Sequence, residues 1–305
     1  MKKIAVFYYT QSGQALQITQ SVCQQLEKRG NTVIYKAIEP ETPFPFPWTC
    51  WSFFETFPES RLAIPVGKLK AFDFSDINDA DLVIISGQPW YLSPSLPLHA
   101  FFQDEEVKAY LKGKMIVNIS GCRNMWVMSQ RKIRQYIYQA GGHYAGHIVL
   151  QDNASNLVGV ITIVRWLLYN KKEATRWLPA AGVSDEDIKN ASRFGITIDE
   201  TLENGNWNDL QNKLMQEKAV DYRPSVIFVE KVGHRMFGIW ANFIRKKGGY
   251  GDKRRAFRIK LFCCYLFFVL YVVSPIGLLV FYLTYPLRIK SINKFKQEMC
   301  FNLNN

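Results

Sequence analysis

A short polar loop near the start of the chain has the residue types that bind a phosphate group. The loop consists of Thr10, Gln11, Ser12, Gly13 and Gln14. The hydroxyl groups of Thr10 and Ser12 are hydrogen-bond donors, and Gly13 lets the main chain come close to an anion. A helical pattern begins at Ala15, so unpaired backbone N–H groups and a positive helix end would face the same point. The alternative is an ordinary turn in which Thr10 and Ser12 only cap the helix.

Two further loops carry groups that could hold an aromatic ring. They consist of Gln88, Pro89, Trp90 and Tyr91, and of Gly121, Cys122, Arg123 and Asn124. Trp90 or Tyr91 could stack on the isoalloxazine of a flavin, and the backbone of the second loop could donate to its pyrimidine edge. Such aromatics are more often core or surface filling when taken singly. Together with the phosphate-sized loop, they favour a nucleotide site.

The elements that must position these loops are buried strands. Residues 3–9, 81–87 and 114–120 are continuous apolar runs, and each leads directly into one of the three loops. Strands are also expected at 32–38 and 143–151, and a helix at 15–29. In an open parallel sheet the carboxyl ends of the strands meet at one edge, so the three loops would converge. The pattern predicts an α/β fold with a doubly wound parallel sheet.

The order of these strands and loops resembles the flavodoxin-like FMN proteins, and the quinone-reductase branch more than the small electron carriers. The resemblance covers about residues 1–155 and implies a five-stranded sheet and an FMN cofactor held by the three loops. In flavodoxins the phosphate loop usually ends in a second Thr, where this chain has Ala15. One phosphate contact is therefore expected to be missing.

Residues 88–95 and 121–126, with the layout of the whole chain, are similar to a narrower group. These are the dialkylresorcinol-biosynthesis proteins of pigment-making bacteria, often labelled dialkylresorcinol condensing enzymes. Condensation is discounted because Cys122 would need two further catalytic side chains and a different, longer fold. The resemblance instead implies an FMN-dependent oxidation that aromatises a lipophilic dialkylcyclohexanedione to a dialkylresorcinol.

Such a reaction needs a base for the carbon proton and a group that stabilises enolate charge. The candidates for the base are Tyr91, His143 and His147, and Arg123 is the candidate for the charge. Other readings stay open. One is an NAD(P)H-dependent quinone or flavin reductase, and another is a membrane-tethered electron carrier or a flavin-free binding domain. The four histidines lack metal-ligand spacing, and no metal site is expected.

The second strong feature is an apolar run at residues 261–287, which holds no Asp, Glu, Lys or Arg. As a helix it would be about 40 Å long, more than the hydrocarbon core of about 30 Å requires. Ser274, Pro275, Ile276 and Gly277 interrupt it. We expect either a single span or, with a slight preference, a re-entrant or interfacial hairpin that turns at 274–277.

Basic residues flank this run on both sides. Residues 245–296 hold twelve Lys and Arg and one acid, so eleven of the net charge of +12 lie here. This local charge indicates an anionic membrane surface as partner, and nucleic acid is not expected. The start of the chain lacks a secretory signal pattern, and the six cysteines lack ligand spacing. We expect attachment to the cytoplasmic face of the inner membrane, a lipophilic small-molecule substrate and a possible homo-oligomer.

The chain thus divides into three segments. Residues 1–155 are the expected FMN-binding domain, 156–244 a mainly helical extension, and 245–305 the basic anchoring segment. Within the first, the aromatic insertion at 40–65 is either a lid or a packing flap. Residues 157–169 are a strand, a core helix or a membrane-facing element, whereas 182–205 and 206–219 are expected to be helical, with Ser184 as a cap.

Overall fold

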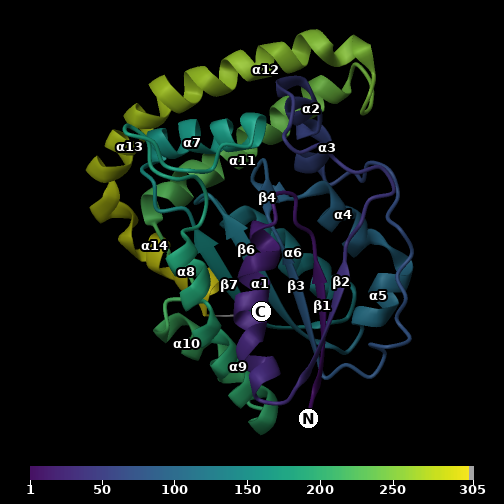
Figure 1. Cartoon of the computed structure of the whole chain (residues 1–305). Helices are drawn as coiled ribbons and strands as arrows, with labels where there is room; N and C mark the ends of the chain where they lie inside the picture. Colours follow the sequence, from purple (N-terminus) through teal and green to yellow (C-terminus); the bar gives the residue numbers. More distant parts are fainter. Residues whose placement is uncertain (302–305) are drawn as a thin grey trace.

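The computed structural model describes residues 1–301, which contain a five-stranded parallel sheet (Figure 1). Its strands are β1 (Lys3–Tyr8), β2 (Thr32–Ala37), β3 (Leu82–Gly87), β6 (Met115–Cys122) and β7 (His143–Gln151). Their order across the sheet is β2-β1-β3-β6-β7, and every neighbouring pair is parallel. This order is that of the flavodoxin-like doubly wound fold, so the predicted fold class is confirmed.

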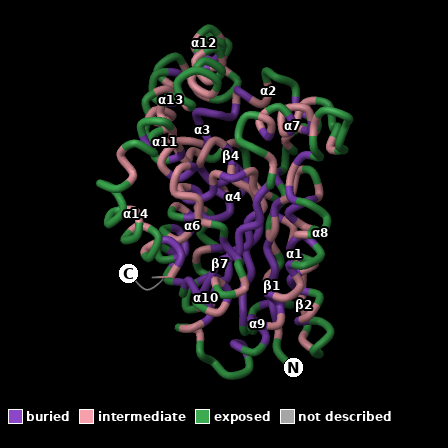
Figure 2. The backbone as a smooth tube through the Cα atoms, turned by 90° about the vertical axis from the view of Figure 1, so that its left-hand side faces the viewer, coloured by how far each residue is buried: buried purple, intermediate pink, exposed green. Residues whose placement is uncertain are grey.

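Helices cover both faces of the sheet. Side chains alternate along each strand, so that Ile4 and Val6 face one layer while Ala5 and Phe7 face the other. The first layer contains α1 (Gln14–Lys28), α9 (Ser192–Asn204) and α10 (Trp207–Gln216). The second contains α4 (Leu96–Gln103), α5 (Glu105–Leu111) and α6 (Val127–Gln139). Both faces of the central strands are therefore buried, as the tube in Figure 2 shows, and β3 is buried at every position.

The helical extension completes this core. Helix α9 packs so closely on α1 that a Cβ at Gly195 would lie 2.1 Å from the carbonyl oxygen of Val22. The remaining connections are α7 (Asn156–Tyr169), α8 (Asp185–Asn190) and α11 (Pro224–Arg245). Ser184 caps α8 by accepting a hydrogen bond from the N–H of Asp187, as predicted. The sequence boundary at residue 155 therefore does not separate two cores.

The aromatic insertion folds into two short helices, α2 (Cys50–Glu55) and α3 (Phe57–Leu62). A small hairpin, β4 (Pro89–Trp90) and β5 (Ser93–Pro94), lies against α3 after strand β3. Both pieces stand above the carboxyl ends of the strands in Figure 1.

The described part of the C-terminal segment is mainly helical from Lys253 onward. It consists of η1 (Lys253–Arg255), α12 (Ala256–Phe268), the π-helical η2 (Val269–Val273), α13 (Ser274–Leu283) and α14 (Tyr285–Cys300). Residues Lys253–Leu283 form one helix long and apolar enough to cross a membrane. The expected hairpin turn at 274–277 is wrong, because Pro275 occupies the first turn of α13, where its missing N–H is tolerated. The π-helical turn η2, which directly precedes α13, accommodates the proline without a reversal of the chain.

Candidate active site

The three predicted loops converge on one cavity of about 190 Å³ at the carboxyl edge of the sheet, beside the β1–β3 switch point. Its lining from these loops is Gln11, Ser12, Gln14, Gln88, Pro89, Trp90, Tyr91, Gly121, Cys122 and Arg123. The rest of the lining comes from the start of α1, the aromatic insertion, α7 and Gly182. Asn124 lies behind the cavity, where it is buried and donates to the Asn156 side chain at 2.6 Å.

The loop from Thr10 to Gln14 leads into α1 without a side-chain cap. The residue before α1 is Gly13, with φ of 85°, and no side chain caps the helix. The alternative in which Thr10 and Ser12 cap α1 is therefore wrong. The Thr10 hydroxyl is buried and has no hydrogen-bond partner within residues 1–301. Thr10 lines a neighbouring cavity with Tyr9 and Gln11, and not the cavity on which the three loops converge. A buried, unsatisfied donor in the loop before a helix fits a phosphate oxygen.

A segment distant in sequence closes the cavity beside this loop. The Gln14 side chain donates to the carbonyl of Val183 at 3.0 Å and accepts from its N–H at 3.1 Å. The N–H of Gly182 donates to Asp152, directly after β7, at 3.1 Å. Gly182 has φ of 81°, and a Cβ there would lie 2.6 Å from the Trp166 ring. Gln14 is thus used to hold this wall, a role that its place in the loop did not indicate.

Aromatic side chains form the slot next to the phosphate loop. Trp90 is buried edge-on against Phe44 and Trp48, with ring centroids 5.2 and 5.4 Å away. The N–H of Trp48 donates to the carbonyl of Leu167 at 2.8 Å, which ties the insertion to α7. Because Phe46, Trp48 and Phe53 line the cavity, the insertion is a wall of the site as well as packing.

Helix α7 supplies the opposite wall. Sequence left this segment unassigned, and the structure shows a helix whose Ile163, Trp166 and Leu167 face the cavity. The Trp166 ring meets Phe46 edge-on at 6.5 Å. The slot is therefore apolar on several sides, as expected for a site that takes a planar ring.

Tyr91 lies in a strained turn at the edge of the slot. Tyr91 and Leu92 form the two-residue loop between β4 and β5 and have φ of 50° and 62°, a conformation that usually requires Asn or Gly. The Tyr91 hydroxyl donates to the carbonyl of Phe53 at 2.6 Å. Burial raises the pKa of Tyr91 well above its usual value. Tyr91 is thus a neutral phenol and is unsuited to be the base.

Arg123 brings a positive charge to the cavity. Its Nη1 donates to Asn124 at 2.9 Å, and its Nη2 donates to the carbonyls of Ser155 and Asn156 at the start of α7. Its guanidinium packs against Gly159, where a Cβ would lie 2.7 Å from Arg123 Nη2. The Arg123 Nε is buried and has no partner in the described part of the chain. The site therefore holds an oriented cation with one free donor.

Burial raises the pKa of two acidic side chains near the site, Cys122 and Glu230. Burial, with a smaller contribution from Glu230, raises the pKa of the Cys122 thiol, so it is not a thiolate nucleophile. Glu230 of α11 is itself buried, and its Oε1 accepts from the N–H of Met128 at the start of α6 at 2.7 Å. Burial raises the pKa of Glu230 to about 7. Nothing in the sequence around Glu230 indicated this position.

The two candidate histidines do not reach the cavity, so their prediction as bases within reach of the loops is wrong. His143 begins β7 and pairs with Met115, at the amino edge of the sheet. His147 is buried in the middle of β7 beside Trp126, and burial lowers its pKa to about 3. A strand places only its last residues at the site, and neither histidine is among them. Residues 1–301 contain no group of three His, Cys, Asp or Glu side chains that could hold a metal.

No protein-family model and no curated protein sequence matches the chain. A solved flavodoxin from the domain Archaea aligns with 66% of this chain and 99% of its own, at 14% identity and a TM-score of 0.39. A flavone reductase aligns with 66% of this chain and 63% of its own, at 13% identity and a TM-score of 0.35. RosB, solved with 8-demethyl-8-formylriboflavin-5′-phosphate bound, aligns with 73% of this chain and 90% of its own, at 10% identity and a TM-score of 0.34. Similarities of this size carry no conclusion about function, and the fold is assigned from the strand order.

Proposed function

We propose that this chain is a membrane-associated FMN-dependent oxidoreductase that acts on a lipophilic ring. One observation carries the proposal. The buried, unpartnered Thr10 hydroxyl lies in the loop before α1, and this loop also lines the aromatic slot that contains the Arg123 cation. These are the groups that a phosphate, an isoalloxazine and a developing anion need, at the edge where doubly wound sheets bind ligands.

The residues fit the parts of FMN in turn. The N–H groups at the start of α1 and the Thr10 hydroxyl would hold the phosphate, and Trp90 and Tyr91 would flank the ring. Arg123 Nε would donate to the ring or to a substrate oxygen. When bound, FMN supplies the hydride acceptor. The missing second Thr at Ala15 leaves one phosphate contact fewer.

The substrate that the narrower resemblance suggests is a dialkylcyclohexane-1,3-dione. Such a dione is a carbon acid that ionises to an enolate, so one proton leaves to solvent. Aromatisation would then remove a proton and a hydride from two adjacent ring carbons, with bound FMN as the hydride acceptor, and the resulting resorcinolate would take up a proton from solvent. Arg123 would bind the enolate oxygens, and the Tyr91 phenol lies at the edge of the same slot.

Membrane association completes the proposal. The helix Lys253–Leu283 has the length and composition of a membrane segment, and basic residues flank it. The positive charge supports attachment to a cytoplasmic, anionic leaflet. Two alkyl chains on the substrate would partition into the same lipid, where the enzyme would meet them.

The test is spectroscopic. Protein purified in detergent should be yellow and should release FMN on denaturation. Anaerobic addition of a dialkylcyclohexane-1,3-dione should bleach the flavin and form a dialkylresorcinol, detected by mass spectrometry. Protein that stays colourless after added FMN would overturn the flavin assignment.

A second outcome separates the main alternative. Bleaching by NADPH, followed by reoxidation with a quinone, without bleaching by the dione, would identify an NAD(P)H-dependent quinone or flavin reductase. A flavin that neither compound bleaches would point to an electron carrier.

A further inference from the structure

We infer that the protein is monotopic: α7 and α12–α13 form one lipid-binding face over the carboxyl end of the sheet, and the active-site cavity takes its substrate from the acyl layer. The inference concerns how the chain meets lipid, and only its substrate route rests on the proposed function. Four observations carry it.

The first observation is that both ends of the apolar helix are fixed to the same folded domain. At its start, the Arg255 guanidinium is fully buried against Glu59 of α3, with hydrogen bonds of 2.7 and 2.8 Å. Phe262 stacks on Phe57 with ring centroids 3.7 Å apart. Near its end, Phe281 is buried against Phe228 of α11 at 5.2 Å.

After the apolar helix, α14 returns to the sheet. Met299 and Cys300 are buried in the same core as Ile4 and Leu26. Arg134 of α6 donates to the Glu298 carbonyl at 3.1 Å. A helix of 31 residues is about 46 Å long, so a spanning helix would leave its end on the far side of a hydrocarbon core of about 30 Å. The observed return excludes that arrangement for this fold.

The second observation is that the outer side of this helix is apolar and free. In its most hydrophobic window only 6% of the residues are buried. Phe257, Phe268, Leu279 and Leu283 are between 57% and 75% exposed. An apolar surface of this extent marks a contact with lipid or another apolar partner.

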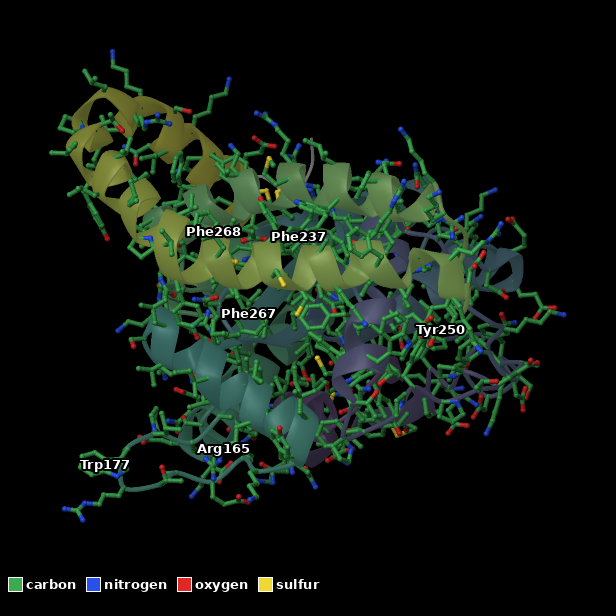
Figure 3. All side chains as sticks on the ribbon, turned by 90° about the horizontal axis from the view of Figure 1, so that it is seen from above. Arg165, Trp177, Phe237, Tyr250, Phe267 and Phe268 are labelled. Carbon is green, nitrogen blue, oxygen red and sulfur yellow. The ribbon has the colours of Figure 1, made fainter. Side chains whose placement is uncertain are left out.

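The third observation is a second apolar face beside it, on α7. Leu157 and Ile161 are exposed, whereas Trp166 on the same helix lines the cavity. Figure 1 shows α7 and α12 on the same side of the molecule, above the strand ends, and in Figure 3, seen from above, Phe267 is labelled between them. Helix α7 therefore lies between the cavity and the outside.

The apolar helix also reaches residues of the cavity. Tyr91 packs against the cluster that contains Phe262 and Cys263 of α12. A ligand that leaves the slot between α7 and the apolar helix would thus move along apolar side chains.

The fourth observation is the charge around this face. Lys171, Arg176, Arg258 and Lys260 border the two apolar surfaces, and Lys171 and Arg176 are exposed. Trp177 is 81% exposed, with the Arg176 guanidinium 5.0 Å from its ring. Exposed Trp beside basic residues is typical of the lipid headgroup level. The occupant is therefore an anionic lipid leaflet.

Trypsin protection tests the orientation without reference to flavin. We expect phosphatidylcholine–phosphatidylglycerol vesicles to slow cleavage after Lys171 and Arg176 by more than about tenfold. Cleavage after Lys112, an exposed residue just before β6 at the opposite edge, should continue. With trypsin outside sealed vesicles, Lys294 of α14 should stay accessible. Protection of Lys294 would indicate a span and overturn the inference.

Matched variants test the part played by α7. Ile161→Glu places a charge on the outer face of α7 and should weaken vesicle binding by more than about tenfold. Tyr138→Glu, at an exposed aromatic residue near the amino edge, should bind as the native chain does. Circular dichroism would verify that both variants fold. Unchanged vesicle binding by folded Ile161→Glu would overturn the inference, while loss of flavin binding with vesicle protection intact would overturn only the proposed function.

Discussion

Glu59 and Arg255 lie 196 positions apart in the chain and form a buried ion pair with two hydrogen bonds. Both side chains are at most 1% exposed. Arg245 donates to the same carboxylate at 2.8 Å, and Arg255 also donates to the carbonyl of Glu55 at 2.7 Å. This cluster holds the start of the apolar helix against α3.

Replacement of Glu59 by Gln should destabilise the protein. The change leaves the Arg255 charge buried without its counter-ion, which costs about 3–5 kcal/mol. Urea unfolding in detergent would measure the loss. Glu39→Gln, in the exposed pair of Glu39 with Lys70, is the control and should cost less than about 1 kcal/mol. Equal losses in the two variants would show that the buried pair does not hold the segment.

Replacement of Gly182 by Ala should weaken FMN binding by at least about tenfold, since the new Cβ would meet Trp166 and Gln14 in a close-packed wall. Fluorescence titration with FMN would measure the dissociation constant. Gly205→Ala is a matched control, because Gly205 has a similar φ of 72° but open space around its Cβ position. If both variants lost FMN affinity to the same extent, backbone strain alone would explain the loss.

Replacement of Thr10 by Val should distinguish phosphate recognition from ring recognition. The hydroxyl would donate to a charged phosphate oxygen, a contact of about 1.5–3 kcal/mol, so the affinity for FMN should fall by about 10- to 100-fold. Riboflavin lacks the phosphate, and its affinity should not change. A parallel loss for both compounds would contradict phosphate binding by this loop.

Replacement of Arg123 by Met should lower the two-electron midpoint potential of bound FMN by about 30–60 mV, because one hydrogen bond from a cation to the reduced ring is lost. Equilibration with redox dyes would measure it. Arg165→Met is the control, since Arg165 is a half-buried cation on α7 that does not line the cavity. An unchanged potential would place Arg123 with the substrate and not with the flavin.

Glu230 should make stability depend on pH. Its pKa is raised by burial to about 7, whereas an unfolded Glu has a pKa of about 4.3. Between these values the folded state holds a proton that the unfolded state has released. The free energy of unfolding therefore falls by up to about 1.4 kcal/mol per pH unit as pH rises from about 4.3 to 7. Above this range Glu230 no longer makes stability depend on pH.

Glu230→Gln should remove this pH dependence of stability. The stability of the variant relative to the native chain should rise between about pH 5 and 7 and then stay constant. Urea unfolding at a series of pH values would show this difference. Glu105→Gln, at an exposed carboxylate, should show no such rise. A constant difference for Glu230→Gln would mean that Glu230 is ionised throughout.

The sheet and the loops that begin the site could be predicted because their signals are local. Apolar runs ending in polar or aromatic loops identified β1, β3 and β6, and β7 was predicted with the bounds His143–Gln151 that the structure has. Parallel topology then required the loops to meet. The same reasoning failed for His143 and His147, because it placed a whole strand at the site although only its carboxyl end reaches there.

The rest of the site depends on contacts that leave no local pattern. Gly182 lies against Gln14, which is 168 positions away in the chain, and Glu230 accepts a hydrogen bond from Met128, which is 102 positions away. Helix α7 is apolar apart from Arg165 on both the side that faces the cavity and the side that faces outward, so its periodicity could not assign it. The hairpin was expected from the interruption at 274–277 and the basic residues on both flanks, yet a proline in the first turn of a helix does not reverse the chain.

The burial of Met299 and Cys300 limits how the protein can be shortened. Deleting everything after residue 244 is the ordinary way to obtain a water-soluble fragment of an anchored enzyme. Here that deletion would uncover the sheet core beside Ile4 and Leu26 and leave the Glu59 carboxylate buried alone. A water-soluble version must instead keep both docking points and exchange only the outward side chains between them.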